Sequence, residues 1–150
     1  MKNTIILLTM LLFSGIGFAQ ESNNGKQLWA KSFLNEKAPE LTVETWISKK
    51  PDTEGKFVII DFWATWCGPC RKAIPELNEI AKEFSKDVVV IGISDEPVEK
   101  IKAMKEPVIE YYYGVDTKKT MDKILEIKGI PHVIIIDPKG IVRWEGFPLL

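Results

Sequence analysis

Two short apolar runs with an amphipathic stretch between them dominate the middle of this 150-residue chain. The runs cover residues 57–62 and 88–93, and runs of this kind are typical of strands buried on both faces of a sheet. Between them, apolar residues recur at helical spacing, with charged residues on the other side: Ile74, Leu77, Ile80, Ala81 and Phe84. Strand, helix and strand make a βαβ unit, so the two strands should be parallel neighbours.

The flanking segments extend this unit to a central mixed sheet with helices around it. Residues 41–47 alternate apolar and polar, as a half-exposed strand does. The other predicted elements are helices at 98–104 and 118–127, a short strand or its approach at 111–113, and a hairpin of strands 133–136 and 141–144 around a type I turn at 137–140. No repeat or interdomain linker appears, so we expect one α/β domain over residues 38–150.

The N-terminal residues follow the plan of a secretory signal peptide. Lys2 gives a positive start, an apolar run follows, and small residues at Gly17 and Ala19 suit a cleavage site. The alternative is a membrane anchor, but an apolar run of about 14 residues is short of the roughly 20 that span a bilayer. We therefore expect a signal peptide at 1–19, a loosely ordered lead-in at 20–37, and a mature protein in the periplasm or cell envelope.

Charge and composition exclude several classes of function. A formal net charge of −1 lacks the basic excess of a nucleic-acid-binding surface, so we expect no nucleic-acid partner. The chain holds two cysteines and one histidine, which is too few for a disulfide-stapled scaffold or a four-ligand zinc site. We accordingly expect no metal, and the chemistry should depend on the two cysteines.

Both cysteines lie at the predicted junction of the first buried strand and its helix, in Trp66-Cys67-Gly68-Pro69-Cys70. A helix N-terminus stabilises a thiolate through its partial positive charge and free amide donors. A spacing of three brings the sulfurs within bonding reach across the first turn, so a disulfide can form and reopen. Cys67 should be the exposed nucleophile, and Cys70, one turn deeper, the resolving thiol.

Two alternatives to redox exchange are weaker. A structural disulfide that closes so short a ring restricts the unfolded chain less than a long loop would. A peroxidase of the peroxiredoxin type requires Thr or Ser three residues before its reactive cysteine, where this chain has Ala64. Dithiol–disulfide exchange is therefore the favoured chemistry, with the Cys67–Cys70 pair as the redox centre and no other cofactor.

The stretch from Asp61 to Cys70, Asp-Phe-Trp-Ala-Thr-Trp-Cys-Gly-Pro-Cys, resembles the active-site segment of thioredoxins. From about Lys37 onward the chain is similar to their exported relatives, the TlpA/ResA-like disulfide reductases. Gly129-Ile130-Pro131 precedes a strand where the family holds a cis-proline, and Pro75 lies where the family kinks its helix. The resemblance implies a thioredoxin-like fold and thiol:disulfide oxidoreductase activity.

The resemblance also implies roles for residues around the cysteines. Pro131 in cis would expose the backbone of Ile130 to an incoming peptide, the alternative being an ordinary trans turn. Buried Asp61 would have a raised pKa and take the Cys70 proton, the alternative being a polar strand end satisfied by water. Trp66 would shield the cysteines and offer an apolar contact surface. His132, the one histidine, is expected to be a bystander.

Gly68 and Pro69 bear on the direction of electron flow. The same pair occurs in thioredoxin, whose potential near about −270 mV makes it a reductant. We therefore expect a monomeric reductase of protein disulfides that is re-reduced by a membrane electron donor, with apocytochrome c among the substrates of some family members. A disulfide oxidase or isomerase, or a non-catalytic peptide-binding module, are the alternatives. Substrate contact is assigned to Trp66, Gly68, Pro69 and Ile130.

The C-terminus departs from the family pattern. The predicted last strand is followed only by a few residues ending at Leu150, whereas the family normally adds a closing helix over one sheet face. We expect that helix to be absent or truncated, with the exposed face covered by residues 20–37 or by a partner if the chain does not continue.

Overall fold

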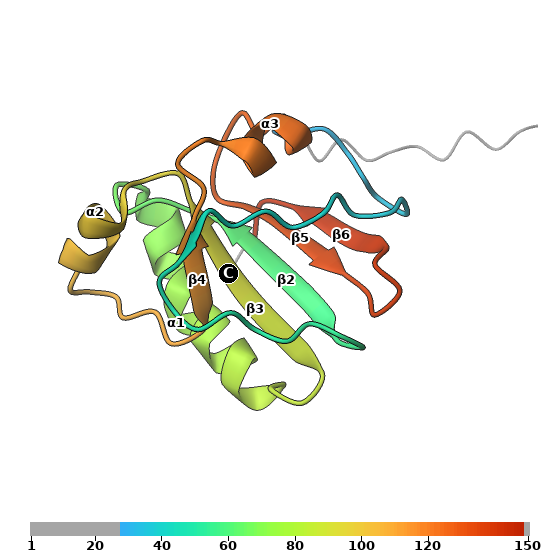
Figure 1. Ribbon diagram of the computed structural model, residues 1–150, viewed down its shortest axis with the longest axis horizontal. Helices are drawn as coiled ribbons and strands as arrows, with labels where there is room; N and C mark the ends of the chain where they lie inside the picture. Colours follow the sequence, from blue (N-terminus) through green and yellow to red (C-terminus); the bar gives the residue numbers. More distant parts are fainter. Residues whose placement is uncertain (1–27, 149–150) are drawn as a thin grey trace, which may run out of the picture.

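The βαβ unit lies at the centre of a six-stranded mixed sheet in the computed structural model, which describes residues 28–148 (Figure 1). The strand order is β1-β4-β3-β2-β5-β6. The strands are β1 (Thr45–Trp46), β2 (Phe57–Phe62), β3 (Val88–Ser94), β4 (Tyr112–Val115), β5 (His132–Ile136) and β6 (Val142–Gly146). The helices are α1 (Gly68–Glu83), α2 (Val98–Ala103) and α3 (Thr120–Leu125). This thioredoxin-like α/β architecture confirms the predicted fold class.

The central pairings follow the sequence pattern. β2 and β3 are parallel and adjacent, in register from Phe57 opposite Val88 to Phe62 opposite Ile93. β5 pairs antiparallel with β2 on one side and with β6 on the other. In the hairpin turn the Gly140 amide donates to the Asp137 carbonyl at 2.8 Å, and Gly140 has φ +78°, which glycine adopts without steric cost. The parallel unit and the hairpin are both confirmed.

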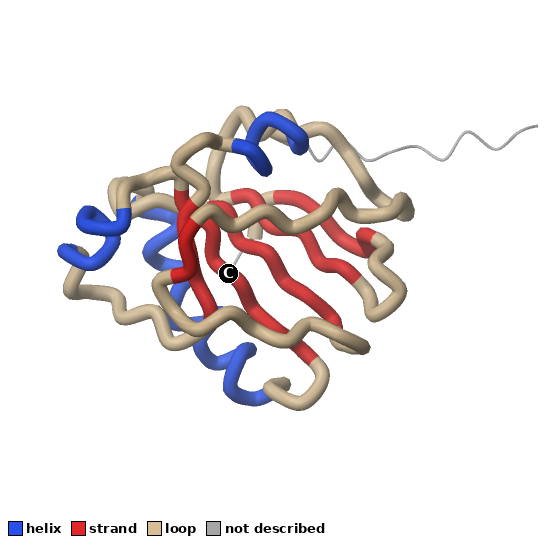
Figure 2. Tube along the Cα trace, in the orientation of Figure 1, coloured by secondary structure: helices blue, strands red, loops and turns tan. Residues whose placement is uncertain are grey.

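Two apolar cores lie on opposite faces of the sheet. Helix α1 covers one face with Ala73, Ile74 and Leu77, and Pro75 lies inside this helix. The other face is covered by α3 and by a loop segment that crosses the strands (Figure 2). That segment contributes Phe33, Ala38, Leu41, Val43 and Trp46 to the second core. Successive residues of β2 therefore face different cores, and Asp61 lies on the α1 side.

Two predicted elements are shorter in the structure. Residues 41–47 form a strand only at β1, where Thr45 and Trp46 pair with Val115 and Gly114 of β4. The residues before β1 instead pack on the sheet face, as Leu41 and Val43 show. The helix expected at 118–127 is reduced to α3, because left-handed residues bound it at Lys119, with φ 56°, and Glu126, with φ 49°.

The described part of the lead-in is irregular but hydrogen-bonded to the rest of the chain. The Lys31 amide donates to the Leu125 carbonyl at 2.7 Å, and the Asn35 amide donates to the Val142 carbonyl at 2.8 Å. Within residues 28–148 no helix follows β6, and no helix is both long and apolar enough to cross a membrane. The expected signal peptide at 1–19 lies outside the described residues.

Candidate active site

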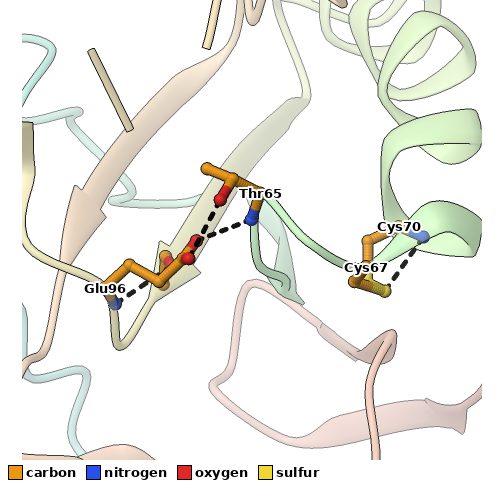
Figure 3. Close-up of a disulfide and its surroundings, with 5 residues drawn as sticks. Thr65, Cys67, Cys70 and Glu96 are labelled. Atoms are coloured by element: carbon orange, nitrogen blue, oxygen red, sulfur yellow. Dashed lines mark hydrogen bonds between the residues drawn. A yellow bond between two sulfur atoms is a disulfide. The ribbon is translucent and has the colours of Figure 1, made fainter. Parts of the chain in front are cut away.

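The two cysteines form a disulfide at the N-terminus of α1 (Figure 3). Their Cα atoms are 5.3 Å apart. Cys67 is the N-cap residue of the helix, and its sulfur accepts a hydrogen bond from the Cys70 amide at 3.2 Å. Pro69 occupies the first turn, where a missing amide hydrogen leaves nothing unsatisfied. When the disulfide is reduced, the same free amides and the helix dipole stabilise a thiolate on Cys67.

The prediction that Cys67 is exposed is wrong. The Cys67 side chain is only 4% exposed, and Cys70 is fully buried. Cys67 is nevertheless the outer of the two, and its neighbours Gly68 and Pro69 are exposed, while Trp66 is 69% exposed. The Cys67 amide donates a hydrogen bond to the carbonyl of Ala64 at 3.1 Å, and both residues belong to the apolar core on the α1 side. A reaction partner therefore reaches the disulfide over the exposed residues around it.

Asp61 is a carboxyl group inside the core on the α1 side of β2. Its side chain has no exposed surface, and burial raises its pKa from 3.8 to about 7. The Tyr111 hydroxyl acts in the opposite direction and lowers the pKa, although neither carboxylate oxygen has a hydrogen bond of regular geometry. The raised pKa of Asp61 agrees with the direction that the sequence analysis expected for a buried carboxyl at this position. A carboxyl group of this kind can accept or donate a proton near neutral pH.

The Ile130–Pro131 peptide bond is cis, as the resemblance implied. Pro131 is buried immediately before β5, and Ile130 is half-buried and packs against both apolar cores. Because His132 pairs with Phe62, this loop lies at the same end of the sheet from which β2 leads to the cysteines. A second cis bond, Glu106–Pro107, was not predicted, and no local sequence signal marks it.

A groove of about 220 Å³ opens beside Trp66 and Ile130. Its apolar lining includes Phe62 and Met121. Charged residues also line it, among them Asp95 and Lys119, which form an ion pair at 2.6 Å, and Asp122. The groove therefore offers apolar contact and charged groups next to the disulfide.

Sequence reasoning missed the support of the loop before the disulfide. Glu96 is buried, and its carboxylate accepts hydrogen bonds from the amide and the hydroxyl of Thr65, two residues before Cys67 (Figure 3). The one signal for it was a polar pair, Asp95-Glu96, directly after a buried strand. His132 is also buried, and burial lowers its pKa. Its ring faces Phe62 at 6.1 Å, a packing role that matches the bystander interpretation.

The described residues contain no group of three or more His, Cys, Asp or Glu side chains that could hold a metal ion. The Cys67–Cys70 disulfide and the buried Asp61 carboxyl support disulfide chemistry: opening by a thiolate, reclosure by the second cysteine, and proton transfer at the carboxyl.

Comparison with curated proteins gives relatives of one kind. The chain is 27% identical over 115 residues to the thioredoxin-like protein YneN of Bacillus subtilis, covering 72% of this chain and 68% of YneN. It is 26% identical over 109 residues to the thiol-disulfide oxidoreductase ResA of the same organism, covering 69% of this chain and 61% of ResA. With the thiol:disulfide interchange protein DsbE of Pseudomonas aeruginosa it shares 29% identity over 154 aligned positions, covering 95% of this chain and 83% of DsbE.

Solved structures agree with this fold. A candidate protein disulfide isomerase from Bacteroides thetaiotaomicron superposes with a TM-score of 0.71 at 30% identity, covering 80% of this chain and 82% of that one. The thioredoxin domain of a thiol-disulfide oxidoreductase from Bacteroides vulgatus gives 0.65 at 29% identity, covering 75% and 86%. The model of the AhpC/TSA family matches residues 34–145. The chain therefore belongs to the AhpC/TSA family and is a thioredoxin-like thiol:disulfide oxidoreductase of the TlpA/ResA type.

Proposed function

We propose that this protein is an exported reductase of protein disulfides. The observation that carries the proposal is the Cys67–Cys70 disulfide at a helix N-terminus, with Gly68 and Pro69 between the cysteines. A helix N-terminus favours the thiolate form of Cys67, and this intervening pair occurs in thioredoxin, a reductant. The apolar leader at residues 1–19 supports export to the periplasm or cell envelope, where disulfides persist in substrates.

The exchange reaction proceeds in two steps. In the first, the Cys67 thiolate attacks one sulfur of a substrate disulfide, which forms a mixed disulfide and releases the other substrate sulfur as a thiolate. In the second, the Cys70 thiol gives its proton to Asp61 and attacks the Cys67 sulfur. The Cys67–Cys70 disulfide forms, the second substrate sulfur departs, and two electrons have moved to the substrate.

The groove beside the disulfide provides contact with the substrate chain. Trp66 and Ile130 line it, and Pro131 in cis presents the backbone of Ile130 for pairing with an extended peptide. Gly68 and Pro69, between the two cysteines, are exposed and leave the approach to the sulfurs open. The substrate is thus held in a strand-like alignment against Cys67.

The protein acts as a monomer and is re-reduced by a membrane electron donor. Protein disulfides are its substrates, and relatives named thiol-disulfide oxidoreductase and thiol:disulfide interchange protein support this exchange chemistry. Envelope redox homeostasis or cytochrome c maturation is the process that we propose it serves. Oxidation or isomerisation of disulfides in the same compartment is the second candidate function, because the relatives include a candidate disulfide isomerase.

The reduction potential separates these functions. Equilibration of the purified protein with glutathione is expected to give a potential near that of thioredoxin, and a value well above about −200 mV would contradict a reductase. Insulin reduction should be lost in Cys67→Ser, and activity that survives unchanged in that variant would exclude catalysis at this site. A Cys70→Ser variant in the native cell should accumulate mixed disulfides whose partners identify the substrates and the donor.

A further inference from the structure

Several buried polar atoms in the described residues have no hydrogen-bond partner of regular geometry. On the α1 side they include both oxygens of Asp61, the indole nitrogen of Trp63 and the hydroxyl of Tyr111. Buried polar groups are normally hydrogen-bonded, so such a group of atoms on one side of a sheet needs an explanation. Trp63 and Tyr111 also belong to the same apolar core as Cys67 and Cys70.

Gly92 is the residue that lets these groups meet. It is the cross-strand partner of Asp61 in the parallel pairing of β2 and β3. A Cβ atom at Gly92 would lie 3.0 Å from the Trp63 indole nitrogen and 3.0 Å from Cε2 of Tyr111. Cε2 is bonded to the ring carbon that carries the hydroxyl, so the hydroxyl end of Tyr111 and the indole N–H both lie over the bare backbone beside Asp61.

We propose that Tyr111 is a positioning residue for Asp61. The Tyr111 hydroxyl donates a hydrogen bond to the ionised Asp61 carboxylate and holds that carboxylate in place to receive the Cys70 proton. This inference rests on the proposed function, in which Asp61 is the proton acceptor of the second step. A donor aimed at a buried carboxylate stabilises its charged form in the same way that it would an anionic ligand. The Trp63 N–H is a second donor on the same side.

Protons and electrons balance in the second step of the exchange reaction. Cys70 loses its proton to Asp61, its sulfur bonds to the Cys67 sulfur, and the bond from Cys67 to the substrate breaks. The electron pair leaves with the substrate sulfur. Tyr111 keeps its own hydrogen throughout, since burial and the neighbouring carboxylate raise its pKa well above the usual value.

Among the described residues, Tyr111 is the one titratable side chain, apart from the cysteines, that lies near Asp61. β3 contributes Gly92 opposite Asp61, and β5 contributes Val133. Helix α1 contributes Cys67 and Cys70 on the same face. Burial raises the pKa of Asp61, and Tyr111 is the group that lowers it. Loss of the Tyr111 hydroxyl should therefore shift the carboxyl toward its protonated form at neutral pH.

The second step can be timed on its own. Reduced protein mixed with one equivalent of Ellman's disulfide releases one thionitrobenzoate when Cys67 attacks and a second when Cys70 closes the disulfide. In Tyr111→Phe the second release should slow about fivefold at pH 7, because one hydrogen bond to a charged group is worth about a tenfold change in proton affinity. Above pH 9 the difference should vanish, because the Asp61 carboxyl is then ionised in both proteins. The matched control, Tyr113→Phe, should follow wild type.

A second measurement does not depend on activity. A ¹³C-carboxyl titration of Asp61 should show its midpoint at higher pH in Tyr111→Phe than in wild type, and an unchanged midpoint would overturn the inference. Asp61→Asn separates the two proposals. If it slows the second release while Tyr111→Phe matches wild type at every pH, the role of Tyr111 is refuted and the proposed function stands. If Asp61→Asn has no effect between pH 5 and 9, the acceptor role of Asp61 fails, and the inference fails with it.

Discussion

The Glu96 carboxylate accepts two hydrogen bonds from Thr65. It accepts a hydrogen bond from the Thr65 amide at 2.6 Å and another from the Thr65 hydroxyl at 2.9 Å. Lys100, which lies in α2 four residues after Glu96, forms an ion pair with the same carboxylate at 2.6 Å. Because Thr65 lies two residues before Cys67, this contact ties the loop that carries the cysteines to the connection between β3 and α2.

Replacement of Glu96 by Gln should destabilise the protein. The amide keeps one acceptor, but it loses the charge and turns an N–H₂ group toward donors, which should lower the free energy of unfolding by about 2 kcal/mol at pH 7. Burial acts to raise the pKa of Glu96, but hydrogen bonds from Lys100 and Thr65 outweigh it and lower the pKa. A group whose pKa falls on folding stabilises above its unfolded pKa, so the difference should shrink as the pH falls below about 4.

Urea unfolding at pH 7 and pH 3 checks this expectation. Glu99→Gln is the matched control, since Glu99 is an exposed acid in the same short helix and should change stability by no more than about 0.5 kcal/mol. Equal stability of Glu96→Gln and wild type at pH 7 would mean that the contact does not hold the loop.

Asp61 should make the oxidised protein less stable as the pH rises. Its pKa rises from 3.8 to about 7 on folding, so the folded state binds the proton more tightly than the unfolded chain. Stability linked to this proton is complete below about pH 4 and is lost as the pH rises to about 7. Asp61→Asn removes the loss, and at pH 8 the variant should exceed wild type by on the order of 4 kcal/mol.

The measurement is urea unfolding of both oxidised proteins at pH 5 and pH 8. Asp87→Asn, at an exposed carboxyl just before β3, should show the pH dependence of wild type. A stability difference between Asp61→Asn and wild type that is the same at both pH values would contradict the raised pKa.

Gly114 should be intolerant of any side chain. A Cβ atom there would lie 2.6 Å from Cγ1 of Val43 and 2.7 Å from the carbonyl oxygen of Thr45. The backbone of β1 cannot yield without losing its two-residue pairing with β4, so Gly114→Ala should cost about 1–3 kcal/mol. The measurement is thermal unfolding by scanning calorimetry, with Gly129→Ala as the control. A Cβ atom at Gly129 would have a Trp29 side-chain carbon as its nearest atom, at 3.6 Å, so this variant should unfold at nearly the wild-type temperature.

Local patterns carried the prediction of the central elements. Short apolar and amphipathic runs predicted the parallel pair β2 and β3, the helix α1 and the position of the cysteines. Such runs consist of residues that are close together in the sequence, so they can be recognised without the folded structure. The cis bond before Pro131 came from family resemblance. Neither source could find the contacts of Glu96 with Thr65, because 31 residues separate them and only the assembled sheet brings them together.

The same limit explains the errors. The alternation at 41–47 correctly marked Leu41 and Val43 as inward-facing, but the strand pairing with β4 covers only Thr45 and Trp46, and a local pattern does not contain the length of a pairing. Tyr111 lies buried in the apolar core on the α1 side of the sheet. Its relation to Asp61 required the bare backbone of Gly92 on a neighbouring strand. Tertiary pairing, more than local preference, therefore determines the support of the site.

Trp66 should matter for large substrates and not for small ones. Its ring is 69% exposed beside the groove, so it contributes little to folding, and Trp66→Ala should unfold at nearly the wild-type urea concentration. An exposed aromatic that becomes buried against a substrate chain typically contributes one to two kcal/mol of binding, so kcat/KM for insulin reduction should fall about tenfold. The rate with Ellman's disulfide, which is too small to fill the groove, should change less than about twofold.

Phe84→Ala, at an exposed aromatic beyond the far end of α1, is the control and should leave both rates unchanged. Equal losses with both substrates would place Trp66 in support of the cysteines and not in contact with the substrate.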